Sequence, residues 1–384
     1  MTHLKAHFLL DPDITFLNHG SFGATPRPVF AAYQQWQREL ERQPVQFIVN
    51  QLPDLLANAR QALGNYLGVD GMDLVYIPNA TFGVNIIANS LDLAAGDEVL
   101  TTNHEYGACD NVWLHYSQQR GFCYKKATLP FPITSSAEIV EAIWQEVTPQ
   151  TKVIFLSHIT SSTALRLPVE AICQRAKEAG ILTFVDGAHA PGQIPLDLAM
   201  LGADFYTGNC HKWMCAPKGS AFLHTRPERQ DLIRPLLFSW GWGEYKNLDY
   251  GSDYLNKLQF LGTDDFASYL AVPDAIAFQK EHDWTAVQTA CHQLAQQAAL
   301  RISDLTGLAP IYPLTTEFCQ QLILIPLPPI DVQTVKQRLW HEFRVEIPVY
   351  EWNGRCYTRV SIQAYNTPDD VNVLVTSLEK LLDA

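Results

Sequence analysis

The stretch Ile181-Leu-Thr-Phe-Val-Asp186-Gly-Ala-His189 decides the fold, because in it an apolar strand ends directly in a carboxylate. In an open α/β sheet the ligand crevice lies outside the carboxyl ends of the strands. We therefore expect the side chain of Asp186 to point into a binding crevice. Taken alone, the segment is equally compatible with an acidic residue in a strand-to-loop turn that binds nothing.

Short apolar runs alternate with amphipathic stretches around this segment, which predicts an α/β architecture with a mostly parallel sheet and helices on both faces. The predicted strands are 74–77, 98–101, 152–156, 181–185, 205–207 and 221–224, and the predicted crossover helices include 137–147 and 169–179. The second of these helices is expected to stop at Gly180, because glycine commonly follows the last helical residue.

The last hundred residues follow a different pattern. Apolar residues recur three or four apart from Trp284 to Gly307, which predicts one long helix. Beyond it we predict a strand at 322–325, a helix capped by Asp331, strands through 345–349 and 357–363, and a final helix after Thr367-Pro368. The chain therefore ends in a smaller α+β unit.

The composition excludes several classes of protein. With 384 residues, 47% of them hydrophobic, the chain can fill a sizeable core. Its 27 Lys and Arg are outnumbered by 40 Asp and Glu, giving a net charge of −13, so nucleic acid is not an expected partner. No window reaches the ~18 apolar residues of a spanning helix and no signal peptide is evident, so we expect a cytoplasmic protein without a membrane partner. The eight scattered Cys indicate reduced thiols and no metal site.

A second informative stretch, Thr207-Gly-Asn-Cys-His211-Lys212-Trp213-Met-Cys-Ala-Pro217-Lys-Gly219, places Lys212 among bulky and apolar neighbours. An apolar pocket lowers the pKa of an ammonium group, which is how lysines become nucleophiles that form Schiff bases with carbonyls. A lysine with a buried stem and its head in water is the commoner arrangement, and the stretch alone leaves both open.

Two further segments could bind anions. Pro78-Asn79-Ala80-Thr81-Phe82-Gly83-Val84-Asn85 lies between a strand and an apolar helix, where free N–H groups and the helix dipole favour a phosphate, although a plain helix cap would look the same. It matches neither the ATP-binding nor the dinucleotide-binding glycine motif. In Tyr357-Thr-Arg-Val-Ser-Ile-Gln363, alternation directs Arg359 away from the core face, where it could hold a carboxylate or a surface ion pair.

Together these features stand in the chain order of the class V aminotransferase family, the fold-type I pyridoxal-phosphate enzymes that include cysteine desulfurases, and the chain resembles that family from Phe16 to the last helix. The strongest anchors are Asp-Gly-Ala-His189, His211-Lys212, and Arg359 followed by Tyr365-Asn-Thr367. The opening Phe16-Leu-Asn-His-Gly-Ser-Phe-Gly23 is most similar to the isopenicillin N epimerase-like branch.

The resemblance implies a large domain with a mostly parallel seven-stranded sheet and a smaller C-terminal α+β domain. We expect the large cofactor-binding domain to span 21–275 and the small domain 276–384. Residues 1–20 would form an N-terminal segment packed near the small domain.

The resemblance also implies pyridoxal 5′-phosphate as the cofactor, with Lys212 forming the Schiff base and Asp186 pairing with the pyridine nitrogen. His189 and Ser161 would support the ring hydroxyl, and Tyr106 would stack on the ring where desulfurases place a histidine. The phosphate would be bound by Ala80, Thr81, Asn209 and His211, and by Thr263 across the interface of a homodimer. Arg359, with Asn18 and His19, would bind the amino-acid substrate through its carboxylate.

The expected enzyme acts at Cα of an amino acid and is most like an epimerase or racemase of the isopenicillin N epimerase type, with Lys212 as the base. The second acid could be Tyr106, His19 or His189, or Lys212 could serve both faces. The alternatives are a C–S lyase, an aminotransferase, or a non-catalytic protein of the same fold. The segment 348–354 is short and lacks the mobile-loop cysteine of desulfurases, and Cys356 lies on the strand itself, which disfavours desulfuration by that route.

Overall fold

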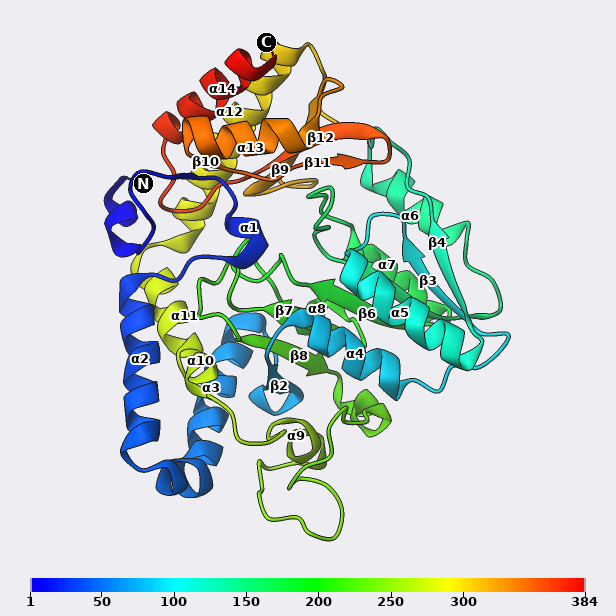
Figure 1. Cartoon of the computed structure of the whole chain (residues 1–384). Coiled ribbons are helices and arrows are strands. Elements are labelled where there is room, and N and C mark those ends of the chain that lie inside the picture. The colour runs from blue at the N-terminus through cyan, green and yellow to red at the C-terminus, as the bar shows by residue number, and fades with distance from the viewer. Residues whose placement is uncertain (1, 383–384) are drawn as a thin grey trace.

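The computed structural model describes residues 2–382, and its centre is a seven-stranded sheet with the strand order β2-β8-β7-β6-β5-β3-β4 (Figure 1). Only β8 runs antiparallel to its neighbours, so the prediction of a mostly parallel sheet is confirmed. The strands are β2 Leu74–Ile77, β3 Glu98–Thr102, β4 Cys123–Ala127, β5 Thr151–Ser157, β6 Leu182–Gly187, β7 Phe205–Asn209 and β8 Ala221–Thr225. Six of these were predicted, and the edge strand β4 was not.

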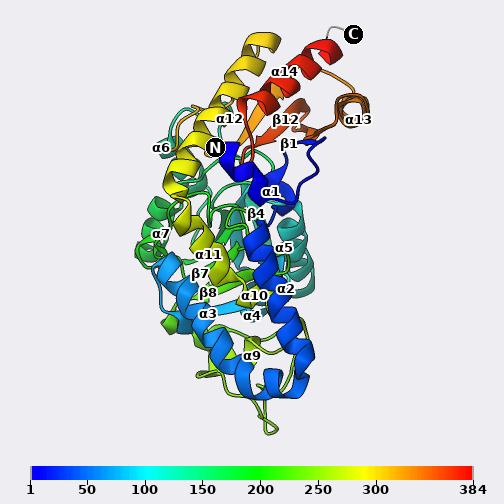
Figure 2. The ribbon, with the colours of Figure 1, turned by 90° about the vertical axis from the view of Figure 1, so that its left-hand side faces the viewer.

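Helices cover both faces of this sheet, as predicted. Helix α5 lies on one side and α7 on the other, and α4 packs against α5 (Figure 2). The helices of this part are α2 Arg27–Arg42, α3 Leu52–Leu67, α4 Ala80–Ser90, α5 Gly107–Arg120, α6 Ser136–Trp144, α7 Val169–Glu178, α8 Leu198–Leu201, α9 Asp253–Leu258, α10 Ala267–Leu270 and α11 Val272–Glu281. Side chains fix several starts: Asn79 caps α4 and Ser135 caps α6.

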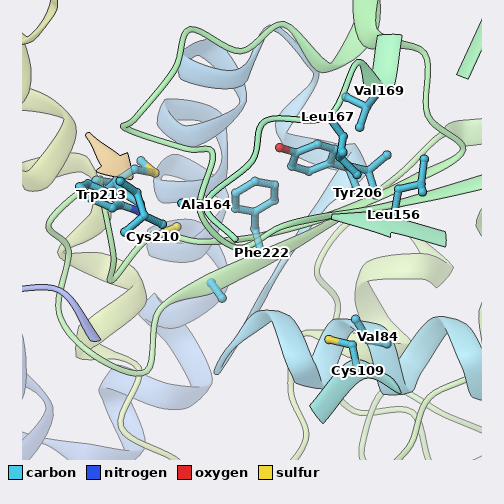
Figure 3. Packing of buried hydrophobic residues seen from close by; sticks show 14 of the residues in the cluster. Val84, Cys109, Leu156, Ala164, Leu167, Val169, Tyr206, Cys210, Trp213 and Phe222 are labelled. Atoms are coloured by element: carbon cyan, nitrogen blue, oxygen red, sulfur yellow. The ribbon is translucent and has the colours of Figure 1, made fainter. Parts of the chain in front are cut away.

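The core runs across the middle strands. Phe155, Phe184 and Phe205 lie on β5, β6 and β7 and are fully buried. The first two rings are tilted with centroids 5.3 Å apart, and the last two are T-shaped at 6.2 Å. Burial of each such ring contributes about 1.5–3 kcal/mol relative to an exposed one. Figure 3 shows the same core reaching Trp213, which follows Lys212 in the sequence, and Cys210, two residues before it. The loop that carries the lysine is thus anchored by buried side chains.

The C-terminal part holds a second, antiparallel sheet with the order β11-β12-β9. Its elements are α12 Trp284–Thr306, β9 Leu322–Leu327, α13 Val332–Phe343, β11 Val349–Trp352, β12 Arg355–Ser361 and α14 Pro368–Leu382. The predicted ends of these helices are confirmed, since Gly307 closes α12, Asp331 caps α13, and α14 begins at Pro368. The α+β prediction for this part is correct.

The single strand predicted through 345–349 is wrong. Pro348, which has no N–H to donate, separates β10 (Val345–Glu346) from β11. Strand β10 pairs instead with β1 (Thr15–Phe16) near the N-terminus. The chain therefore changes partners at the proline.

The end of the N-terminal segment lies between the two sheets. After β1, Asn18 bridges to Ser361 of β12, and the short helix α1 (His19–Phe22) sits between the small sheet and the large one (Figure 1). The division at residues 20/21 and 275/276 stays a prediction. None of the helices within residues 2–382 has the length and hydropathy that crossing a membrane would require.

Candidate active site

Nine of the thirteen predicted site residues meet at the carboxyl ends of β5, β6 and β7, where a cavity of about 510 Å³ opens. Its lining includes Ala80, Thr81, Tyr106, Ser161, Asp186, His189, Asn209, His211 and Lys212. Ser21 and Phe22 of α1 also line it, and the sequence did not assign either to the site. Strand ends of one parallel sheet thus converge on one crevice, as the fold class predicts.

A second hollow is larger but has different chemistry. It is a groove of about 1130 Å³ whose lining includes Asp70, Glu170 and Lys177. All three are exposed. The smaller cavity is the candidate site because it brings a buried acid close to a desolvated lysine.

The acid is Asp186, at the end of β6 and 3% exposed. Its carboxylate accepts the backbone N–H of Ala188 at 2.9 Å and the thiol of Cys109 at 3.4 Å. Burial raises the pKa of Asp186, whereas the Ala188 hydrogen bond and the positive charge of Lys212 oppose the rise. Neither donor carries a charge, so the carboxylate is arranged to receive a cationic partner in the cavity.

The amine of Lys212 faces His189, with 3.1 Å between Nζ and Nε2. The indole N–H of Trp213, which can only donate, lies 3.3 Å from His189 Nδ1. Nδ1 therefore accepts, the imidazole proton is on Nε2, and Nε2–H donates to a neutral lysine amine. Desolvation lowers the pKa of Lys212 to about 8, although the charge of Asp186 opposes this. Burial likewise lowers the pKa of His189 well below its usual value, so both groups are neutral in mildly alkaline solution.

The N-terminus of α4 forms another wall. Asn79 Oδ1 accepts the N–H of Phe82 at 2.9 Å, and Asn209 Oδ1 accepts the N–H of Ala80 at 2.9 Å. Of the two main-chain donors expected for a phosphate, Ala80 is thus already paired, and Asn209 acts by holding the helix start. His211 Nδ1 lies 3.0 Å from the carbonyl oxygen of Ser220 and so donates to it, and burial lowers the pKa of His211 to about 4.

Arg359 is not at the surface. Both faces of β12 are buried, and Arg359 is 7% exposed. Its Nη1 donates to the carbonyl oxygen of Ser161 and, at 3.2 Å, to the Ser161 hydroxyl, while Nη2 donates to the Ser21 hydroxyl at 3.3 Å. Both serines line the cavity, which brings the guanidinium to its edge. The Ser161 hydroxyl, expected to contact the cofactor, is engaged by Arg359.

Besides Arg359, which reaches only the edge of the cavity, three other predicted residues do not line it. His19 is fully buried, contacts the main chain of Lys212 and does not line the cavity; its contact with substrate and its role as the second acid stay predictions. Asn18 accepts the Ser21 hydroxyl at 2.6 Å and is likewise not part of the lining. Thr263 lines a separate hollow beside Gly262 and Asp264, and its role across a dimer interface stays a prediction.

A second buried acid was missed. Glu105 is 6% exposed, and its carboxylate accepts the N–H and hydroxyl of Ser157 and the hydroxyl of Thr102. Ser157 of β5 is in register with Asp186 of β6, so it links Glu105, which follows β3, to the strand next to that of Asp186. A signal was present, because Glu105 comes three residues after the end of β3, a strand that was predicted.

The family model of the class-V aminotransferases matches residues 23–374. The chain belongs to the class-V aminotransferase family. Isopenicillin N epimerase of Amycolatopsis lactamdurans is 37% identical over 97% of this chain and 96% of its own length, and that of Streptomyces clavuligerus is 34% identical over 98% and 97%. A cysteine desulfurase of Escherichia coli, 20% identical, shares the fold over 99% of this chain and 98% of its own, with a TM-score of 0.83.

Class-V aminotransferases are pyridoxal-phosphate enzymes, and the donor set of this cavity fits that cofactor. A primary amine with a lowered pKa suits an aldehyde, and a buried carboxylate with two neutral donors suits a protonated ring nitrogen. The start of α4 suits the phosphate. A phosphate dianion beside His211 would also favour its imidazolium, reversing the effect of burial on the His211 pKa.

Proposed function

We propose that this class-V aminotransferase is an amino-acid epimerase or racemase of the isopenicillin N epimerase type, working at Cα. The observation that carries the proposal is the amine of Lys212, whose pKa is lowered to about 8. Its Nζ lies 3.1 Å from Nε2 of His189 in the cavity. The support from relatives is the 34–37% identity to two isopenicillin N epimerases over nearly the whole chain.

When bound, pyridoxal phosphate supplies the electron sink that acidifies a substrate Cα–H. Lys212 would attach the cofactor and, once freed, remove that proton. Asp186 would hold the ring nitrogen in its protonated form, and His189 Nε2–H would donate to the ring hydroxyl. The positions of the three side chains around one cavity support these roles.

Thr81, Ala80, Asn209 and His211 would surround the phosphate, with Ala80 acting through its pairing to Asn209. Arg359 would bind the α-carboxylate of the substrate, which fixes the orientation of Cα toward Lys212. A guanidinium already held by Ser161 and Ser21 loses little freedom when a carboxylate binds.

Inversion needs a proton returned to the face opposite Lys212. Of the candidates, His189 stands beside the lysine amine, whereas Tyr106 reaches the cavity from the loop before α5. We assign the second acid to the hydroxyl of Tyr106, which also offers a flat ring for stacking. Positioned proton transfer of this kind contributes about 10²- to 10⁴-fold to a rate.

The decisive experiment is deuterium exchange at Cα in D₂O, screened over a panel of L-amino acids and short amino-acid conjugates and read by NMR with chiral analysis of the product. The proposal requires exchange accompanied by the D-epimer. Release of a keto acid with ammonia would instead identify a lyase, and a keto acid with an aminated cofactor would identify an aminotransferase.

The attachment site is tested separately. Borohydride should fix the cofactor to a peptide containing Lys212, and a labelled peptide without that residue would refute the assignment. A homodimer with Thr263 completing the partner's phosphate site, a cytoplasmic location and the domain division at 20/21 and 275/276 are further parts of the proposal. Sedimentation of the purified protein tests the dimer.

A further inference from the structure

Residues 18–23 contact the main chain of Lys212 and the guanidinium of Arg359, although they are far from both residues in sequence. His19 lies 193 residues from Lys212, and Ser21 lies 338 residues from Arg359. We propose that residues 18–23 are a positioning segment: His19 fixes the main chain of Lys212, Ser21 fixes the guanidinium of Arg359, and the segment thereby sets the spacing between amine and carboxylate-binding group. The second half rests on the proposed function of Arg359.

The contact with Lys212 is a directed hydrogen bond. His19 Nε2 lies 3.0 Å from the carbonyl oxygen of Lys212, which can only accept, so Nε2 carries the proton. Nδ1 then accepts from the hydroxyl of Tyr365 at 2.9 Å. One neutral tautomer satisfies both bonds, and burial, which lowers the pKa of His19 to about 3, keeps the ring neutral. His19 thus acts as a fixed bridge between Tyr365 and the lysine loop.

The other end of the segment packs on the same loop. Gly23 has φ +72°, and a Cβ there would lie 2.0 Å from the carbonyl oxygen of His211 and 3.0 Å from Cα of Lys212. The Gly23 N–H donates to the carbonyl of His19 at 2.8 Å, which closes the turn. A side chain at this position would displace the lysine loop, so the close approach of the two main chains requires glycine.

The contact with Arg359 is braced in the same way. The Ser21 hydroxyl donates to Asn18 Oδ1 at 2.6 Å. The same hydroxyl oxygen accepts a hydrogen bond from Nη2 of Arg359 at 3.3 Å. Asn18 in turn bridges to Ser361, two residues beyond Arg359 on β12. The segment is therefore bonded to the strand that carries the guanidinium and to the loop that carries the amine.

The first test uses the cofactor-free full-length protein. Carbamylation of Lys212 by cyanate, followed against pH by peptide mass spectrometry, should have a midpoint near 8 in the unchanged protein. His19→Leu removes the bridge, so the amine gains water and the midpoint should rise by about one pH unit. His19→Gln, whose amide can donate to Lys212 and accept from Tyr365, should restore it. Tyr365→Phe, which loses one hydroxyl and keeps its packing, should raise the midpoint as His19→Leu does.

A matched control separates positioning from general damage. His292 is also buried and bonds a main-chain carbonyl, that of Gln320, away from the cavity. His292→Leu should lower the melting temperature without moving the Lys212 midpoint. If the His19 and Tyr365 variants melt earlier but leave the midpoint unchanged, His19 is merely structural and the proposal fails.

The second test uses ligand binding to the cofactor-loaded protein, read by its visible spectrum. Ser21→Ala should weaken binding of an α-amino acid by roughly 3- to 10-fold, the value of one hydrogen bond, while binding of the matching amine without a carboxylate stays the same. Equal weakening of both ligands would overturn the role of Ser21. Neither test needs turnover. Both can therefore be interpreted even if the deuterium experiment shows no exchange and the proposed epimerisation is wrong.

Discussion

Replacing the buried acid Glu105 by glutamine should change how the stability of the protein depends on pH. Burial raises the pKa of Glu105 from 4.5 to about 7, opposed by the hydrogen bonds from Ser157 and Thr102 and reinforced by the charge of Asp186. Glutamine has the same shape and can keep the bonds, with its oxygen accepting from Ser157 and its amide donating to Thr102. The substitution therefore removes the titration with little change in packing.

The sign and size follow from linkage. Because the pKa of Glu105 is higher in the folded protein than in the unfolded chain, its contribution is fully present below about pH 4.5 and is lost as the pH rises through about 7. At about 1.4 kcal/mol for each pKa unit, the loss reaches about 3 kcal/mol. Glu105→Gln has no such loss, so its free energy of unfolding should gain about 3 kcal/mol relative to the unchanged protein between about pH 4 and pH 8.

The assay is urea unfolding at a series of pH values, comparing the two proteins so that the titrations of the buried histidines cancel. Glu342→Gln is a control of opposite sign, because the hydrogen bond from Arg338 lowers the pKa of the exposed Glu342 carboxyl. A difference between Glu105→Gln and the unchanged protein that stays flat from about pH 4 to pH 8 would refute the reasoning.

Three other substitutions test the site. Arg359→Ala should raise KM for carboxylate-bearing substrates roughly 10- to 100-fold with the cofactor content unchanged, and an unchanged KM would remove it from the substrate site. Tyr106→Phe should keep deuterium exchange at Cα but slow formation of the D-epimer by about 10²-fold, whereas equal loss of both would contradict its role as second acid. Gly23→Ala should lower the melting temperature far more than Gly96→Ala. Both glycines have positive φ, but of the two only Gly23 has main-chain atoms where a Cβ would lie. Equal melting temperatures for the two variants would show that the clash is relieved.

Much of the fold could be predicted from local patterns. Strands buried on both faces, such as β6, are continuous apolar runs, and helix ends such as Gly307 carry recognisable caps. Strand β4 was missed because it is an edge strand with exposed Cys123 and Lys126, so burial leaves no apolar signal there. The strand through 345–349 was wrong because alternation alone cannot show that the pairing partner changes at Pro348.

The site could be predicted where chemistry is attached to a strand end, as at Asp186, or to an apolar loop, as at Lys212. It could not be predicted where a role depends on contacts between distant segments. Alternation along the strand predicts the face on which Arg359 lies. It cannot predict that Ser161 and Ser21, from distant segments, bond to its guanidinium. The sequence of the opening motif likewise does not show whether His19 faces substrate or bonds to a distant main chain. In the structure it bonds to the carbonyl oxygen of Lys212.

The pairing of β1 with β10 and the bond between His19 and Tyr365 join the first and last parts of the chain. His19 and Tyr365 are 346 residues apart. At a synthesis rate of ~5–20 residues per second, Tyr365 is made roughly 15 to 70 s after His19. The lysine loop therefore acquires this support only after Tyr365 has been synthesised, and a chain released before that point would carry the reactive amine without the hydrogen bond from Tyr365 that holds His19.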